Sequence, residues 1–153
     1  MENCLICKRI ALIKENKNKF FVTELKSGYV VLGDHQYYKG YTLLLSKIHV
    51  NELHKLKLKA RNEFLKDMAF VAEAVYRAFK PKKINYELLG NTDSHLHWHI
   101  FPRYVDDPKP DFTIWVTPRS IRCSKNTIPS DKDLRVMKEK LLIEINKLLR
   151  VKV

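Results

Sequence analysis

The stretch that most constrains this chain is residues 95–103, HLHWHIFPR, in which polar and apolar residues alternate. In a β-strand, alternate side chains lie on the same face, about 7 Å apart. The three histidines would then line one face, while Leu96, Trp98 and Ile100 point into the core. We therefore predict a strand with a histidine face that is available for function and an apolar face that packs in the core.

Three histidines in register call for a functional explanation, because imidazole has only an intermediate tendency to be buried. They can be the ligands of a catalytic zinc ion that keeps one position open for water. They can instead form a phosphate site, in which one neutral imidazole attacks phosphorus. The third alternative is a surface strand with idle histidines, and the residues of the strand alone leave all three open.

Other segments share with this stretch a resemblance to a known family. HLHWHIF fits the His-φ-His-φ-His-φ-φ signature, with φ apolar, of the histidine-triad (HIT) nucleotide hydrolases and transferases. Residues 40–49 (GYTLLLSKIH) resemble the family's Gly-His-strand-Pro-Lys-x-His element, and residues 4–7 (CLIC) resemble its Cys-x-x-Cys. Residues 85–91 and 106–108, with Ile114-Trp115, resemble a bacterial, diadenosine polyphosphate hydrolase-like branch. The resemblance covers residues 1–117 in the right order.

Length and composition predict a single domain. The chain has 153 residues, 45% of them hydrophobic, which suffices for one sizeable core. It has no apolar run of 18 residues, and MENCLICKRI lacks the pattern of an export signal, so we expect a soluble, cytoplasmic protein without membrane contact. Three cysteines, an odd number, favour thiols or metal ligands over a disulfide framework.

The net charge of +12 favours an anionic partner such as a nucleotide, a polyphosphate or nucleic acid. Charge alone does not choose among them. The lysines are spread along the chain and do not form one run, so a solvated surface explains many of them. A purine nucleotide, the partner that the family implies, is therefore preferred over nucleic acid.

Hydrophobic patterning predicts an α+β fold with a five-stranded, largely antiparallel sheet. Residues 8–14 are expected to form a short strand or a helical turn, and residues 20–24 and 29–32 a hairpin around Lys26-Ser27-Gly28. Residues 41–46 should be a central strand, and residues 84–89 and 96–103 two more around Gly90-Asn91. A long helix is expected to start with Asn51 as its N-cap and to stop at Pro81.

Residues 105–129 contain four prolines and are predicted to be an irregular tail. Ser130 to Asp133 resemble a capping box, and a closing amphipathic helix follows, which completes the core or makes a dimer contact. We assign residues 1–117 to the HIT-like region, and residues 118–153 to a tail and helix of the same domain.

The resemblance implies a reaction at the α-phosphorus of a nucleoside phosphate. His97, the middle histidine, would attack to form a nucleotidyl-histidine, and His99 would bind the phosphate and help the leaving group depart. Diadenosine polyphosphates and adenosine phosphoramidates are candidate substrates, and a nucleoside monophosphate is the product. The alternative is a regulator that binds nucleotide or nucleic acid without turnover. Family members pair as homodimers, in which Trp115 could reach the partner's site.

The resemblance also suggests binding residues. Asp34 aligns with an acid that accepts hydrogen bonds from ribose, although a turn aspartate explains it equally well. Asn91, or less favourably Asn85, would bind the α-phosphate. Asp93 departs from the family: either it points away from the site, or the leaving-group preference differs. Tyr41 replaces a common histidine after Gly40, and it is expected to remove one partner of the triad strand.

Finally, the family implies a structural zinc ion. Cys4 and Cys7 alone are a weak signal, but the resemblance adds His49 and His95 as further ligands of a closed, four-coordinate site. Two ordinary thiols without metal are the alternative. Cys123 has no expected partner and is interpreted as a bystander.

Overall fold

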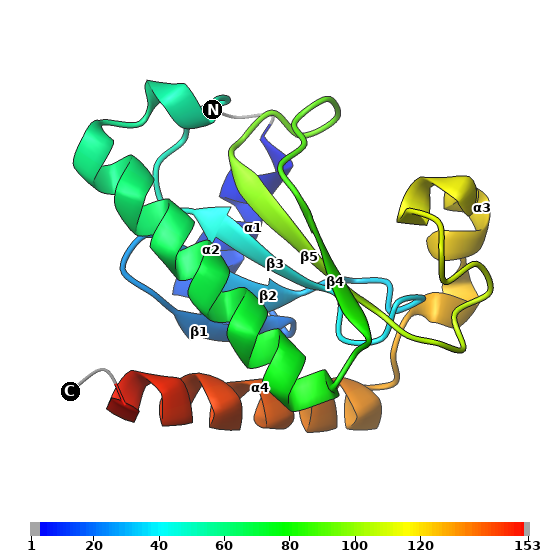
Figure 1. The fold of residues 1–153 in the computed structure, drawn as a ribbon. Helices are drawn as coiled ribbons and strands as arrows, with labels where there is room; N and C mark the ends of the chain where they lie inside the picture. The colour runs from blue at the N-terminus through cyan, green and yellow to red at the C-terminus, as the bar shows by residue number, and fades with distance from the viewer. Residues whose placement is uncertain (1–3, 152–153) are drawn as a thin grey trace.

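The computed structural model describes residues 4–151, in which five antiparallel strands form one sheet of order β1-β2-β3-β5-β4 (Figure 1). The strands are β1 (Phe21–Glu24), β2 (Gly28–Leu32), β3 (Thr42–Ser46), β4 (Lys83–Glu87) and β5 (His97–Arg103). The predicted α+β class is confirmed, and β3 is the central strand as expected.

Helices cover both faces of the sheet because its strands carry apolar side chains on both sides. The helices α2 (Leu58–Phe79) and α4 (Asp131–Val151) pack on one face, in one core with Val30, Leu44 and Ile100. The helix α1 (Leu5–Lys14) packs on the other face, against Val31 and Leu45 (Figure 1).

Two predicted helix starts need correction. Residues 8–14 form neither a strand nor a single turn. They belong to α1, a helix of ten residues whose N-cap is Cys4. Asn51 is not an N-cap: α2 begins only at Leu58, after the 3-10 helix η1 (Leu53–Lys55). The physical reason is that the carbonyl of Val50 accepts a hydrogen bond from the amide of Leu96, which ties this segment to the triad strand.

The strands around the triad are shorter than predicted. β4 ends at Glu87, so residues 88–96 form a long connection and not a tight turn around Gly90-Asn91. β5 begins at His97 and leaves His95 and Leu96 before the strand. The first histidine of the motif therefore lies outside the regular sheet.

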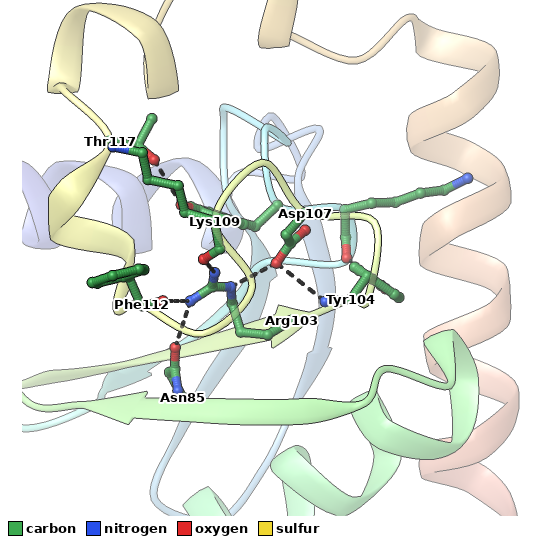
Figure 2. A network of polar contacts seen from close by, with 9 residues as sticks. Asn85, Arg103, Tyr104, Asp107, Lys109, Phe112 and Thr117 are labelled. Carbon is green, nitrogen blue, oxygen red and sulfur yellow. Dashed lines mark hydrogen bonds and ion pairs between the residues drawn. The ribbon is translucent and has the colours of Figure 1, made fainter.

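The tail after β5 is irregular but ordered around one buried arginine (Figure 2). Arg103, 4% exposed, donates to the Asp107 carboxylate, to Asn85 Oδ1 and to the carbonyls of Lys109 and Phe112. Beyond this network lie η2 (Ile114–Val116), α3 (Arg119–Arg122) and η3 (Lys125–Thr127). Figure 1 shows α3 set to the side of β4 and β5.

The closing helix α4 starts as its sequence indicates. Ser130 Oγ accepts a hydrogen bond from the amide of Asp133 at 3.1 Å and donates to the Asp133 carboxylate. Its apolar stripe lies in the same core as α2. Among residues 4–151, no helix is both long and apolar enough to span a membrane.

Candidate functional site

Pairing with β3 decides which face each triad residue presents. His97 lies opposite Leu45 and His99 opposite Leu43, and these leucines pack on the side of the sheet that α1 covers. Trp98 and Ile100 lie in the other core, with α2. The alternation predicted from the sequence is thus confirmed for His97 and His99.

His97 is held by the backbone of its own motif. It is 5% exposed, and its Nδ1 lies 2.6 Å from the carbonyl oxygen of His95. Because a carbonyl can only accept, Nδ1 carries the proton and donates, which leaves the lone pair of neutral imidazole on Nε2. Nε2 is therefore the nitrogen of this ring with a lone pair available for chemistry.

His99 is oriented by Tyr41, whose hydroxyl lies 2.6 Å from His99 Nδ1. Burial, then the Asp34 and Glu87 carboxylates, raise the pKa of the Tyr41 phenol well above its usual value, so the phenol keeps its proton. Burial, and next His97, lower the pKa of His99 to about 3, so its imidazole is neutral at pH 7. The phenol therefore donates to Nδ1, and Nε2 of His99 carries the proton.

The expectation that Tyr41 removes a partner from the triad strand is wrong. Tyr41 stacks on Phe101, with ring centroids 4.1 Å apart, and reaches His99 from that position. A Cβ atom on Gly33 would collide with the Tyr41 ring, so the glycine makes room for it. The histidine that is common in the family is absent at this position, but the phenol of Tyr41 makes a hydrogen bond to the triad strand from there.

Both histidines open onto two adjoining hollows. One, of about 280 Å³, is lined by α1 residues, Asp34, His97 and His99. The other, of about 360 Å³, includes Asn91, His97 and His99. Tyr41, Asp93 and Trp115 line both, so the two form one site with the histidines in the middle. We call the first the α1 hollow and the second the loop hollow.

The expected binding residues divide between this site and another network. Asp34 lines the α1 hollow, where the Arg9 guanidinium donates to both of its carboxylate oxygens. Asn91 lines the loop hollow. Asn85 instead accepts from Arg103 and lies outside the residues that line either hollow (Figure 2).

For other residues of the site, the structure differs from what the sequence predicted. Asp93 lines both hollows, so it does not lie away from the site. Cys123, interpreted as a bystander, is exposed and lines both hollows. Trp115 lines the hollows of its own chain. Arg9, Arg119 and Arg122 were missed, because only the fold brings α1 and α3 to the triad.

The four expected metal ligands meet at the start of β5. One ligand atom from each of Cys4, Cys7, His49 and His95 lies within 4.8 Å of every other. Nδ1 of His95 is 3.6 Å from Cys4 Sγ, 3.4 Å from Cys7 Sγ and 3.1 Å from His49 Nδ1. A tetrahedral zinc ion separates such ligands by about 3.3 to 3.8 Å, given its bond lengths to nitrogen and sulfur.

The proton of His95 is directed away from this cluster. Its Nε2 donates to the carbonyl oxygen of Ser46 at 2.8 Å, so the lone pair of the neutral ring faces the thiols from Nδ1. An outer hydrogen bond of this kind is typical of metal-ligating histidines. The donor set and its geometry fit a closed zinc site, in which no ligand comes from His97 or His99.

Comparison with known proteins gives one consistent result. The model of the HIT domain family matches residues 14–106. The chain is 29% identical to Protein hit of Bacillus subtilis over 108 residues, which cover 67% of this chain and 72% of the relative.

Solved structures share the fold. A histidine triad protein of Sinorhizobium meliloti superposes with a TM-score of 0.72 at 17% identity, over 85% of this chain and 93% of that protein. A diadenosine triphosphate hydrolase of Plasmodium falciparum superposes with a TM-score of 0.62 at 16% identity, over 84% of this chain and 78% of that protein.

Proposed function

Because the chain belongs to the HIT domain family, we propose that it is a nucleotide hydrolase or transferase acting at the α-phosphorus of a nucleoside phosphate. One observation carries the proposal: the hydrogen bond from His97 Nδ1 to the His95 carbonyl leaves Nε2 as a free nucleophile beside a cavity. Diadenosine polyphosphates and adenosine phosphoramidates are the candidate substrates, and a nucleoside monophosphate is the product.

The first step forms a bond between His97 Nε2 and the α-phosphorus. As that bond forms, the bond from phosphorus to the leaving group breaks, and its electron pair departs with the leaving group. Water then attacks the phosphorus, the electron pair of the P–N bond returns to Nε2, and a proton passes to solvent. Covalent catalysis of this kind divides one difficult displacement into two easier ones.

His99 assists as a hydrogen-bond donor and not as an acid. Tyr41 fixes the proton on Nε2 of His99, which then donates to a phosphate oxygen next to His97. A neutral donor aimed at developing negative charge stabilises the transition state without rearrangement. Asn91, from the loop hollow, offers its amide to the same phosphate.

The nucleoside of the substrate is assigned to the α1 hollow. Asp34 accepts hydrogen bonds from the ribose hydroxyls there, because a carboxylate already paired with Arg9 keeps free lone pairs on both oxygens. Apolar side chains of α1 and β2 form a surface for a purine. A homodimer is part of this proposal, and size-exclusion with light scattering tests it.

Cys4, Cys7, His49 and His95 are assigned to a structural zinc ion. Zinc in a closed four-ligand site contributes to folding and holds no water for catalysis. The site would tie α1 to the start of β5, since the ligands come from both segments.

The test offers the protein diadenosine tetraphosphate and an AMP–amine conjugate and follows the release of AMP by chromatography. We expect AMP from at least one of them, and activity at low temperature that survives exhaustive chelation, which excludes a three-histidine catalytic zinc site. If neither is consumed and His97→Ala binds AMP as tightly as the parent, the protein is a nucleotide-binding regulator and the proposal is wrong.

A further inference from the structure

We propose that Arg119 and Arg122 form the binding site for the leaving group, and that this site selects substrates whose leaving group is a polyphosphate chain. The inference rests on the proposed function, which it narrows. It concerns the tail between β5 and α4, where the resemblance suggested a role for Trp115 but none for the two arginines.

Both arginines border the reacting histidines. They line the α1 hollow and the loop hollow together with His97 and His99. Arg9, the third arginine of the site, lines the α1 hollow but not the loop hollow. A substrate with its nucleoside beside Arg9 and its α-phosphorus at His97 therefore extends its leaving group towards α3.

Arg122 is positioned in advance. Its Nε donates to the Thr117 carbonyl at 2.8 Å, and its guanidinium lies 5.0 Å from the centre of the Trp115 ring. Thr117 is itself buried, and its hydroxyl is hydrogen-bonded to the Tyr38 hydroxyl. These contacts use the Nε edge and one flat side of the guanidinium, so the two terminal nitrogens stay available for an anion. A preformed fork of this kind binds phosphate oxygens in pairs.

The charges on the two sides of the histidines differ. Arg9 is neutralised by Asp34. Among residues 4–151, no carboxylate lies within ion-pair distance of Arg119 or Arg122. Asp93 lines the same hollows. Burial raises the pKa of the half-buried Glu87 carboxyl, and Arg122 lies near enough to oppose that rise in part. Two unpaired cations remain on this side, and a polyphosphate has the charge to match them.

The state of His99 favours the same class of leaving group. With its pKa lowered to about 3, His99 is neutral at pH 7 and has no acidic proton to give away. An amine departs from phosphorus only after it gains a proton, whereas a polyphosphate departs as a stable anion. Cationic side chains stabilise the charge that develops on such an anion.

The experiment compares two substrates with the same α-phosphorus. Diadenosine tetraphosphate has a polyphosphate leaving group, and the p-nitrophenyl ester of AMP has an uncharged aryl group that needs no protonation. The measured quantity is the ratio of their kcat/KM values, in the parent, in Arg119→Gln/Arg122→Gln, and in Arg135→Gln. Arg135 is an exposed arginine of α4, so the third protein loses a positive charge outside both hollows.

We expect the ratio to fall about tenfold or more in the double variant, because charge-assisted hydrogen bonds to phosphate are lost. It should stay at the parent value in Arg135→Gln. An unchanged ratio in the double variant, or an equal fall in Arg135→Gln, overturns the proposal.

Binding of inorganic tripolyphosphate, measured by calorimetry, separates this proposal from the proposed function. The double variant should bind it about tenfold more weakly than Arg135→Gln does. If the parent cleaves neither substrate but the two variants differ in tripolyphosphate binding in this way, the proposed function fails and the anion site stands. If the two variants bind tripolyphosphate equally, the anion site is wrong whatever the enzyme cleaves.

Discussion

His95 and His97 are two residues apart, yet their imidazoles lie in opposite kinds of surroundings. Nδ1 of His95 lies among two thiols and a second imidazole, and its Nε2 is bonded to Ser46, so both ring nitrogens have protein partners. Among residues 4–151, His97 has a hydrogen-bond partner at Nδ1 only, and its ring borders a cavity. A histidine whose nitrogens are both engaged can hold a structure together, while one with a free nitrogen can react.

The two regions are also connected by a single carbonyl. The carbonyl oxygen of His95 accepts a hydrogen bond from His97 Nδ1, so a residue of the Cys/His cluster also orients the proposed nucleophile. Changes at the cluster should therefore act mainly on stability, and changes at the cavity mainly on turnover. The following predictions test that division, from the largest expected effect to the smallest.

His97→Ala should reduce turnover by on the order of a thousandfold or more, because the group that forms the covalent bond is gone. Its zinc content and melting temperature should stay close to those of the parent. His54→Ala, which removes an exposed histidine of η1, is the matched control and should keep full activity. Loss of zinc in His97→Ala would contradict the division.

Cys4→Ser/Cys7→Ser should lose about one zinc ion per chain and melt on the order of 10 °C lower, because a metal bound only by the folded state stabilises it. Hydrolysis should remain measurable at low temperature. Cys123→Ser should keep its zinc and serves as the control. A double variant that binds zinc as well as the parent would place the metal elsewhere and remove His95 from its ligands.

Tyr41→Phe should lower kcat about tenfold, with a smaller effect on KM, because the phenol no longer fixes the proton of His99 on Nε2. The tautomer is measured directly by nitrogen-15 NMR of the histidine ring. The parent should show His99 protonated at Nε2, and the variant a mixture. Tyr76→Phe, at an exposed position of α2, should change neither readout. An unchanged His99 signal in Tyr41→Phe would show that the hydrogen bond does not select the tautomer.

The smallest effect concerns stability against pH. The pKa of His99 is about 3 in the folded protein and near 6.5 unfolded, so between these values the unfolded chain binds more protons. Its stabilising contribution is complete above pH 6.5 and is lost as the pH falls towards 3. We expect His99→Gln to show a shallower fall of melting temperature over this range, by a few degrees. Parallel curves for parent and variant would contradict the shifted pKa.

The sequence predicted the parts of the fold that depend on local pattern. Alternation in residues 95–103, the hairpin before Leu32 and the stripe of α4 all rely on neighbours two to four residues apart, and all three elements are present. The start of α2 was misplaced because Val50 pairs with Leu96, a partner 46 residues away that no local pattern reveals. Arg103 is the last residue of its strand, as predicted, but no local pattern showed that its side chain also organises the tail.

The sequence predicted those residues of the site that belong to a family motif. It did not predict those that only the tertiary packing brings there. Cys4, Cys7, His49 and His95 come from a resemblance, and they do lie together. Arg9 and Arg122 carry no motif, and each reaches the cavity only through the packing of its own helix. Tyr41 was misjudged because a substitution in a motif was interpreted as the loss of a partner for the triad strand, although the new side chain still contacts His99.

The central claim is that His97, and not His99 or a metal-bound water, attacks the phosphorus. Rapid acid-free quenching during turnover of diadenosine tetraphosphate, followed by mass spectrometry of the peptides, tests it directly. The account predicts an adenylyl group on His97 that appears and decays at rates compatible with turnover. Turnover without any adduct, or an adduct on His99, would contradict it.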